Sequence, residues 1–247
     1  MEKTLEERWF PFSTYALDDI EHKKIFCFHH AGGSASVYRK WTLEKKKMNF
    51  ICVELPGKGT RRREPFVGDF KKLLEPLCES IVKVTQGNPF ILFGHSMGAA
   101  MAFYVADYLQ NKYNIRPEKL IAAGRQAPQD EDPGEFKTYM GDDALIRELK
   151  KYNATPKEIL ENKELLQYIL PEVRKDYTLN ESLIYHGERI DAPIYINCGS
   201  RDIGATSAIM QHWQSVTTQE FKEKEFEGDH FFVLNSEQYP EYLATAG

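Results

Sequence analysis

The most informative stretch of the sequence is Phe90–Ala100, which has the sequence FILFGHSMGAA. The apolar residues that open it predict a buried strand, and the small and apolar residues that close it predict a helix. Between them lies the pattern G-x-S-x-G, with Gly94 and Gly98 on either side of Ser96. A serine in a strained strand-to-helix turn needs small residues two positions before and after it, because the neighbouring backbone is close. We therefore predict that Ser96 is a catalytic nucleophile near a helix N-terminus, where developing negative charge is favoured.

Apolar runs of similar length continue along the chain and alternate with helical spacing. Strands are predicted at Lys24–Phe28, Asn49–Leu55, Phe90–Phe93, Lys119–Gly124, Ala192–Cys198 and Phe221–Phe226. Helices are predicted around 70–84, at Met97–Gln110 and at Thr206–Trp213, and Pro76 predicts a late start or a kink in the first of them. Strands that alternate with helices favour a parallel sheet with right-handed crossovers. Together with the serine motif, this pattern predicts an α/β-hydrolase fold, with a mostly parallel central sheet flanked by helices.

The alternation stops between about residues 130 and 189, where the chain is charged and helical in several pieces. An interruption of about 60 residues is too long for a plain connection. We interpret it as a helical lid inserted over the C-terminal edge of the sheet, within a single domain that covers residues 1–247. Two further strand–helix units are the alternative, which the lack of a β-branched run makes weaker. A final helix after Tyr239-Pro240 is expected to be short, and the C-terminus at Gly247 is expected to be truncated.

The composition is that of a soluble globular protein, with 42% hydrophobic and 28% charged residues in a chain of 247. The longest apolar run, Ala99–Ala106, is far shorter than the roughly 20 residues of a membrane-spanning helix. Met1–Phe10 lacks the apolar segment of a signal peptide, so a cytoplasmic location is expected. The net charge of −5 predicts no nucleic-acid binding. The cysteines lack a C-x-x-C spacing and are predicted to be buried thiols: Cys27, Cys52, Cys78 and Cys198.

A serine hydroxyl is a weak nucleophile until a base removes its proton. In chains with this motif the partners follow in the order serine, acid, histidine. That order excludes four of the seven histidines, namely His22, His29, His30 and His95. His186 has no acid on a preceding strand, and His212 lies in a helical pattern. We predict His230 as the base, because it lies in the loop after the last strand.

The acid is expected in the loop after the preceding strand, where Asp202 follows Gly199-Ser200-Arg201. Its carboxylate would accept a hydrogen bond from His230 and fix the tautomer of that ring. Asp229 is too close in sequence to His230 to reach the ring easily, and Asp191 precedes the strand. A turn-forming aspartate is the alternative role for Asp202.

Acyl transfer also needs backbone donors for the tetrahedral oxyanion. One is predicted to be the N–H of Met97, directly after the nucleophile. The other is expected from the glycine-rich loop His29–Ser34, where we choose the N–H of Ala31. An ordinary glycine turn is the alternative for this loop. A phosphate-binding loop is excluded, because neither GxxxxGK[ST] nor GxGxxG is present, and no metal or cofactor is required.

Five blocks of the sequence, in this order, resemble the type II thioesterases, the discrete editing enzymes of non-ribosomal peptide and polyketide synthesis. The blocks are Phe26–Ser36, Glu54–Gly59, Gly94–Gly98, Gly124–Pro128 and Gly228–Phe232. Leu170–Asp176, in the predicted lid, resembles a sixth. The resemblance covers almost the whole chain. The medium-chain acyl thioesterase of fatty-acid synthesis is a relative of this family.

The resemblance implies hydrolysis of acyl thioesters from the phosphopantetheine arm of acyl or peptidyl carrier proteins. It implies Ser96 as nucleophile, Asp202 as acid and His230 as base, with Ala31 and Met97 as oxyanion donors, in agreement with the choices above. A monomer is expected. His29 stands where the family usually has proline or another non-basic residue. Asp229 stands where glycine is common, and it is predicted to raise the pKa of the neighbouring base.

Several other functions share these features. A general serine esterase or peptidase, or an acyl-CoA or fatty-acyl thioesterase of the same fold, would have the same triad. A type I release domain is disfavoured by the modest lid. A non-catalytic module that binds carrier proteins is also considered, since fold does not fix function.

Overall fold

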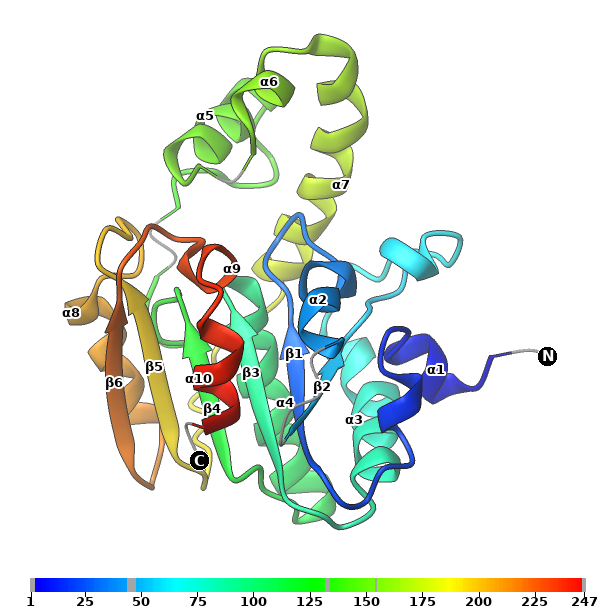
Figure 1. Ribbon diagram of the computed structural model, residues 1–247. Helices are drawn as coiled ribbons and strands as arrows, with labels where there is room; N and C mark the ends of the chain where they lie inside the picture. Colours follow the sequence, from blue (N-terminus) through cyan, green and yellow to red (C-terminus); the bar gives the residue numbers. More distant parts are fainter. Residues whose placement is uncertain (1–2, 44–47, 132–133, 154, 246–247) are drawn as a thin grey trace.

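The computed structural model describes residues 3–43, 48–131, 134–153 and 155–245 (Figure 1). Its centre is a parallel six-stranded sheet in the order β2-β1-β3-β4-β5-β6. The strands are β1 (Lys23–Phe28), β2 (Met48–Cys52), β3 (Phe90–His95), β4 (Lys119–Ala123), β5 (Ile194–Gly199) and β6 (Phe221–Phe226). Each coincides with a predicted strand, apart from small differences at the ends. The predicted α/β-hydrolase fold is confirmed.

The strand order reverses between β1 and β3. From β1 the chain turns outward to β2, whereas β3 begins a run toward β6 on the other side. Loops that leave the C-terminal ends of two such strands diverge and open a crevice, where ligands of open α/β sheets bind. The glycine-rich loop follows β1 and the serine motif follows β3, so both predicted parts of the site lie at this crevice.

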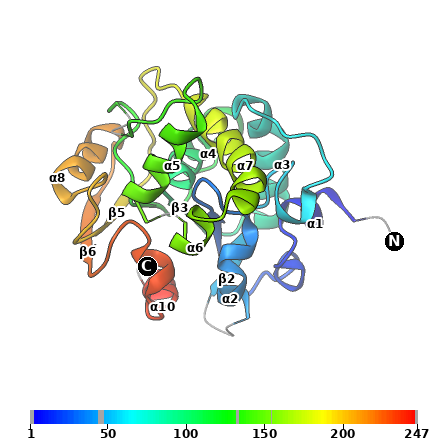
Figure 2. The same ribbon diagram turned by 90° about the horizontal axis from the view of Figure 1, so that it is seen from above.

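Helices cover both faces of the sheet, so its strands, apart from the outer strand β6, are buried on both sides (Figure 2). Phe26 and Leu92 pack into one core with α3 (Lys71–Thr85) and α4 (Met97–Tyr113). Ile25 and Ile91, one position away on the same strands, pack into the other core. The second core also contains residues of α2 (Arg39–Thr42), α9 (Phe232–Asn235) and α10 (Tyr239–Thr245). This alternation follows from the two-residue period of a strand.

Two predicted helices differ from expectation in detail. The helix α3 begins at Lys71 and continues through Pro76, so the predicted late start is wrong. A proline in a helix removes one backbone hydrogen bond, and the buried apolar face of α3 offsets that loss. The helix predicted at 206–213 is α8 (Ser207–Met210) followed by the 3-10 helix η4 (Gln211–Val216). The remaining short helices are α1 (Leu5–Trp9), η1 (Thr14–Ala16), η2 (Ala35–Tyr38) and η3 (Gly59–Arg61).

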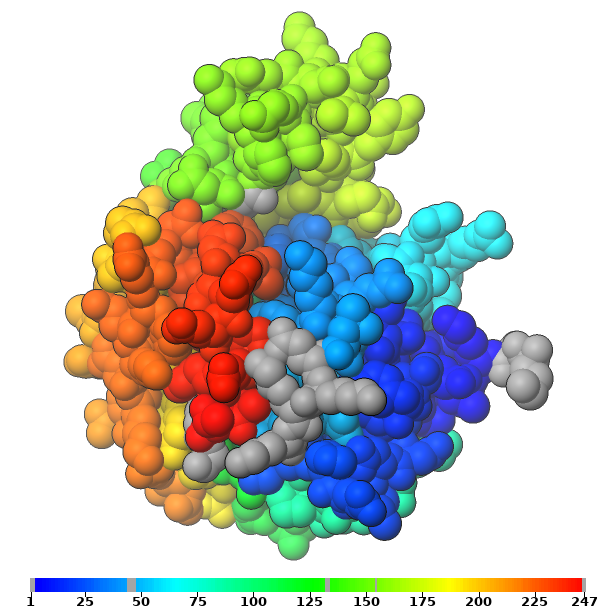
Figure 3. Space-filling model, in the orientation of Figure 1, coloured from blue at the N-terminus to red at the C-terminus, as the bar shows by residue number. Residues whose placement is uncertain are grey.

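Between β4 and β5 the described residues form three helices, which lie over the C-terminal edge of the sheet (Figure 1). They are α5 (Asp142–Lys151), α6 (Lys157–Leu160) and α7 (Lys163–Glu181). We call residues 134–153 and 155–189 the helical insertion; in Figure 3 it rises above the rest of the molecule. Its apolar side chains form a small core of their own. The described part of this stretch contains no strand, so the alternative of two further strand–helix units is wrong.

The two outer strands of the sheet differ in their surroundings. Along β2, the Ser13 hydroxyl donates to the Phe50 carbonyl (2.8 Å) and accepts from the Cys52 N–H (3.3 Å). Along β6, Lys222–Glu225 are exposed and alternate in charge. The four cysteines are buried free thiols, as predicted. Within the described residues, no helix has the length and apolar character needed to span a bilayer.

Candidate active site

Ser96 lies in the sharp turn between β3 and α4 and has a backbone conformation (φ 55°, ψ −121°) that is rare for a residue with a side chain. Its neighbours leave no room for larger residues. A Cβ atom on Gly94 would lie 2.1 Å from the carbonyl oxygen of Gly98, and a Cβ on Gly98 would lie 2.1 Å from that of Phe28. The two glycines therefore let the strand, the turn and the loop after β1 approach one another, which presents Ser96 at the sheet edge.

His230 and Asp202 form a hydrogen-bonded pair close to this turn. His230 Nδ1 lies 2.8 Å from Asp202 Oδ2. Asp202 follows β5, and its side chain is fully buried. Its other oxygen, Oδ1, accepts the N–H groups of Gly204 (3.0 Å) and Ala205 (3.1 Å). These two donors hold the carboxylate in a fixed orientation, with Oδ2 toward the imidazole.

The environment of Asp202 keeps its carboxyl group ionised. Burial raises its pKa, but the hydrogen bond and charge of His230 and the N–H groups of Gly204 and Ala205 outweigh that effect and lower the pKa below its usual value. An ionised carboxylate only accepts hydrogen bonds, so Nδ1 of His230 is the donor. The neutral ring then has a lone pair on Nε2, which can take a proton.

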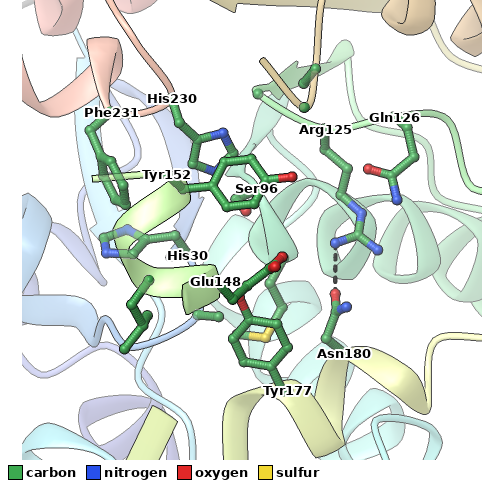
Figure 4. A pocket seen from close by; sticks show the side chains of 16 residues that line it. His30, Ser96, Arg125, Gln126, Glu148, Tyr152, Tyr177, Asn180, His230 and Phe231 are labelled. Atoms are coloured by element: carbon green, nitrogen blue, oxygen red, sulfur yellow. Dashed lines mark hydrogen bonds between the residues drawn. The ribbon is translucent and has the colours of Figure 1, made fainter. Parts of the chain in front are cut away.

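A pocket brings these residues together under the helical insertion (Figure 4). Ser96, His230, Ala31 and Met97 line it from loops at the sheet edge. The helical insertion contributes further lining residues, which are Glu148, Leu149, Tyr152, Tyr177 and Asn180. A hydrogen bond of 2.6 Å from Arg125 Nη1 to Asn180 Oδ1 joins the loop after β4 to α7 at the pocket wall (Figure 4).

The protein-family model of the thioesterase domain matches residues 23–246 of this chain. The chain belongs to the thioesterase family. It is therefore a hydrolase that acts on thioesters, and the family predicted from the sequence is confirmed.

Relatives of this thioesterase include two proteins named for gramicidins. Gramicidin S biosynthesis protein GrsT of Aneurinibacillus migulanus is 32% identical, over 86% of this chain and 84% of that protein. LgrE of Brevibacillus parabrevis, named a linear gramicidin dehydrogenase, is 38% identical over 87% of this chain and 82% of that protein. Among solved structures, ClbQ from the colibactin NRPS/PKS pathway is similar, with a TM-score of 0.81 and 28% identity. That match covers 91% of this chain and 96% of ClbQ.

The other acidic and histidine candidates of the thioesterase make different contacts. Asp229 Oδ1 accepts the N–H of Phe231 (2.9 Å) within its own loop. Asp191 precedes β5 and pairs with Arg116 on the surface. His212 and Asp130 form an exposed pair, and His186 is also exposed.

His95 has a role that the sequence analysis did not assign. Its Nε2–H donates to the carbonyl oxygen of His230, at 2.7 Å. Burial and the nearby His230 lower the pKa of His95 to about 3, so the ring is neutral. The residue before the nucleophile therefore holds the backbone of the histidine partner of Asp202. Chain order gave no reason to connect His95 with His230, and only the folded chain brings these two residues together.

The thioesterase pocket walls from the helical insertion were also missed. A signal for them existed in α5, where Leu145, Glu148, Leu149 and Tyr152 share one face of the helix. That spacing predicts a helix face that packs against another part of the protein. It does not identify the active-site pocket as the partner.

Proposed function

We propose that this thioesterase removes acyl groups from the phosphopantetheine arm of acyl or peptidyl carrier proteins. The role is editing or housekeeping in non-ribosomal peptide or polyketide synthesis. The observation that carries the proposal is the Asp202–His230 pair, whose histidine lines one pocket with Ser96 beneath the helical insertion. The names of GrsT and ClbQ, which refer to gramicidin S biosynthesis and to an NRPS/PKS pathway, support the biosynthetic setting.

In the first half of the cycle, His230 Nε2 takes the proton from Ser96 as its oxygen attacks the thioester carbonyl. The carbonyl oxygen becomes negative, and the N–H groups of Ala31 and Met97 stabilise it. Asp202 stabilises the imidazolium that forms. The tetrahedral intermediate collapses, the C–S bond breaks, and His230 returns the proton to the pantetheine thiolate. Ser96 is then acylated and the carrier protein leaves with a free thiol.

In the second half, His230 takes a proton from water as that water attacks the Ser96 ester. The same two N–H groups stabilise the second oxyanion. Collapse of this intermediate breaks the bond to Ser96, and His230 returns the proton to the serine oxygen. The products are the free acid and the restored enzyme, and every step uses groups of this chain and water alone.

The helical insertion acts as the lid of this pocket, within a single domain. Its position over the C-terminal edge of the sheet supports this role, as do the side chains that it places in the pocket. The lining it provides is mixed, because Glu148 and Asn180 are polar while Leu149 is apolar. A monomeric state and a cytoplasmic location stay predictions.

A carrier protein loaded with acetyl-phosphopantetheine tests the proposal. Deacylation would be followed by intact mass, with the wild-type protein beside Ser96→Ala. Release by the wild type and none by the variant is the expected result. If the loaded carrier is stable but a simple soluble ester is hydrolysed, the enzyme is a general esterase. If neither is hydrolysed, the catalytic assignment is wrong.

A further inference from the structure

The peptide group that precedes Ala31 is held by two hydrogen bonds to its carbonyl oxygen. The carbonyl oxygen of His30 accepts from His29 Nδ1–H (2.8 Å) and from the N–H of Gly33 (3.0 Å). This carbonyl belongs to the same peptide group as the N–H of Ala31. In a planar trans peptide the two bonds point in opposite directions, so donors that hold the carbonyl oxygen also fix the direction of that N–H.

The peptide group on the second side of Ala31 is held by the helical insertion. The N–H of Gly32 donates to Asp176 Oδ2 at 2.6 Å. Asp176 lies on α7, 144 residues further along the chain. Gly32 has φ +84°, which few other residues adopt, and Val173 Cγ2 lies 3.5 Å from where a Cβ on Gly32 would be. Both peptide groups that flank Ala31 are therefore fixed, one from the loop itself and one from α7.

Asp176 is itself fixed by charge. Its side chain is fully buried, and Oδ2 also accepts from Lys58 Nζ at 2.7 Å. Lys58 comes from the loop after β2 and is only 6% exposed. A buried carboxylate needs such partners, because loss of its hydration is otherwise uncompensated. The ion pair therefore keeps a charged acceptor in place for the N–H of Gly32, and hydrogen bonds to charged acceptors are the stronger ones.

We infer that Asp176 of α7 and His29 are positioning residues, which aim the N–H of Ala31 at the oxyanion of the transition state. This inference rests on the proposed function, which makes Ala31 an oxyanion donor. Asp176 acts through the backbone and touches neither Ser96 nor the substrate carbonyl. The lid helix thus contributes to the chemical step as well as to the pocket wall.

The arrangement couples the acyl pocket to the oxyanion donors. Tyr177 and Asn180, one and four residues after Asp176 on α7, line the pocket that takes the acyl group. Because α7 carries both sets of side chains, a displacement of this helix by a badly fitting acyl group would also move the acceptor of the Gly32 N–H. Acyl groups that fit against α7 are then hydrolysed faster, through a larger kcat rather than tighter binding.

A matched pair of double variants tests the role of Asp176. Lys58→Met removes the buried ammonium, so that Asp176 can be replaced without leaving an unpaired charge. On this background, Asp176→Asn keeps an oxygen acceptor for Gly32, whereas Asp176→Leu has a similar size and no acceptor. Turnover would be measured with p-nitrophenyl acetate and with the acetylated carrier protein. The inhibition constant of a trifluoromethyl ketone, which adds to the serine and forms an oxyanion, would be measured beside them.

We expect kcat of the Leu variant to be about 10- to 100-fold below that of the Asn variant, somewhat less than the loss of a whole oxyanion donor. KM is expected to be unchanged, and affinity for the ketone is expected to fall in proportion to kcat. Equal kcat and equal ketone affinity in the two variants would overturn the inference. If the wild type hydrolyses the ester but not the carrier-bound acetyl group, the carrier-protein proposal fails while the ester comparison still tests Asp176.

A second matched pair tests His29 and covers the case in which a double variant does not fold. Asn places an amide N–H near the position of Nδ1, so His29→Asn retains the donor to the His30 carbonyl, whereas His29→Leu removes it. We expect kcat and affinity for the ketone to be lower in His29→Leu and restored in His29→Asn. Loss of activity in both variants to the same degree would mean that His29 only fills space.

Discussion

The sheet edge and the helical insertion contribute to one pocket in different ways. The sheet edge is supported by two buried cores, and backbone atoms approach so closely there that Gly94 and Gly98 admit no side chain. Most buried apolar side chains of the helical insertion form a small separate core, although Leu179 packs into a core of the sheet, and the insertion presents exposed side chains such as Tyr139 and Tyr168. The proposed catalytic groups, namely Ser96, Asp202 and His230, come from the sheet edge. The insertion supplies walls, and Asp176 and Asn180 of α7 connect it to loops at the sheet edge.

The largest difference in kcat is expected between substitutions of two aspartates, one at the sheet edge and one in the helical insertion. In Asp202→Asn, the N–H groups of Gly204 and Ala205 retain the side-chain oxygen, so the amide faces His230 Nδ1. The ring must then carry its proton on Nε2 and cannot accept one from Ser96. We expect kcat for p-nitrophenyl acetate to fall by about 10⁴-fold, as for a triad of this type.

The control for this change is Asp142→Asn in the helical insertion. Asp142 is 64% exposed and pairs with Arg174 at the surface. An exposed ion pair of this kind contributes at most about 1 kcal/mol, so kcat should not change. A loss of less than tenfold in Asp202→Asn would remove Asp202 from the catalytic set.

The same Gly-to-Ala change should have opposite consequences in the two regions. A Cβ on Gly98 would meet the carbonyl oxygens of Phe28 (2.1 Å) and His29 (2.8 Å), which are backbone atoms without freedom to move. We expect Gly98→Ala to lower the free energy of unfolding by about 3 kcal/mol or more, the upper range for overpacking. Urea denaturation followed by circular dichroism measures this change.

Gly141, at the N-terminus of α5, has no atom within 4 Å of a Cβ and a φ of −69°. Gly141→Ala should therefore change the free energy of unfolding by no more than about 0.5 kcal/mol. Similar losses in Gly98→Ala and Gly141→Ala would show that the two regions are equally rigid.

Hydrogen exchange should reveal the difference in rigidity between the sheet and the helical insertion without any substitution. Amides of β3 and β4, between two cores, should exchange only through global unfolding. Amides of α5 and α6 should exchange through local opening, with a free energy about 2 kcal/mol or more below the global value, because few buried contacts hold these helices. Mass spectrometry of peptic fragments measures both. Equal protection would mean that the insertion unfolds together with the sheet.

The smallest effect is expected from the pocket wall. The centres of the Tyr152 and His230 rings lie 5.4 Å apart. On its other contact, the Tyr152 ring packs so closely on Gly204 that a Cβ there would lie 2.7 Å from Tyr152 Cε1. Tyr152→Ala opens this side of the pocket, and we expect kcat/KM for the acetylated carrier to fall about tenfold, since one side-chain contact is worth about 1–3 kcal/mol. The control Tyr168→Ala, at a side chain 77% exposed, should leave kcat/KM unchanged. An unchanged kcat/KM in Tyr152→Ala would show that the insertion does not shape the site.

The sequence allowed accurate prediction where local rules govern. The strand–turn–helix around Ser96 and the strands of the sheet follow from sterics and hydrophobic patterning, and both are visible in one sequence. The catalytic roles of Ser96, Asp202 and His230 stay predictions. The contacts of the insertion depend instead on how α5 and α7 pack on distant loops. No local pattern connects Asp176 with Gly32 or His95 with His230. Pro76 was misjudged for a related reason, since tertiary burial of α3 outweighs the local cost of a proline.

The two outer strands have a consequence for self-association. An uncovered strand offers its N–H and C=O groups to a second chain and can start aggregation. On β2 the Ser13 hydroxyl occupies two of these groups, so a foreign strand would first have to displace it. On β6 the exposed Lys-Glu-Lys-Glu run keeps the edge charged and hydrated, so a second chain that paired with it would have to remove water from these side chains. A hydroxyl of the same molecule thus bonds to the β2 edge, and charged side chains cover the β6 edge. We therefore expect the folded enzyme to resist growth of its sheet into fibrils.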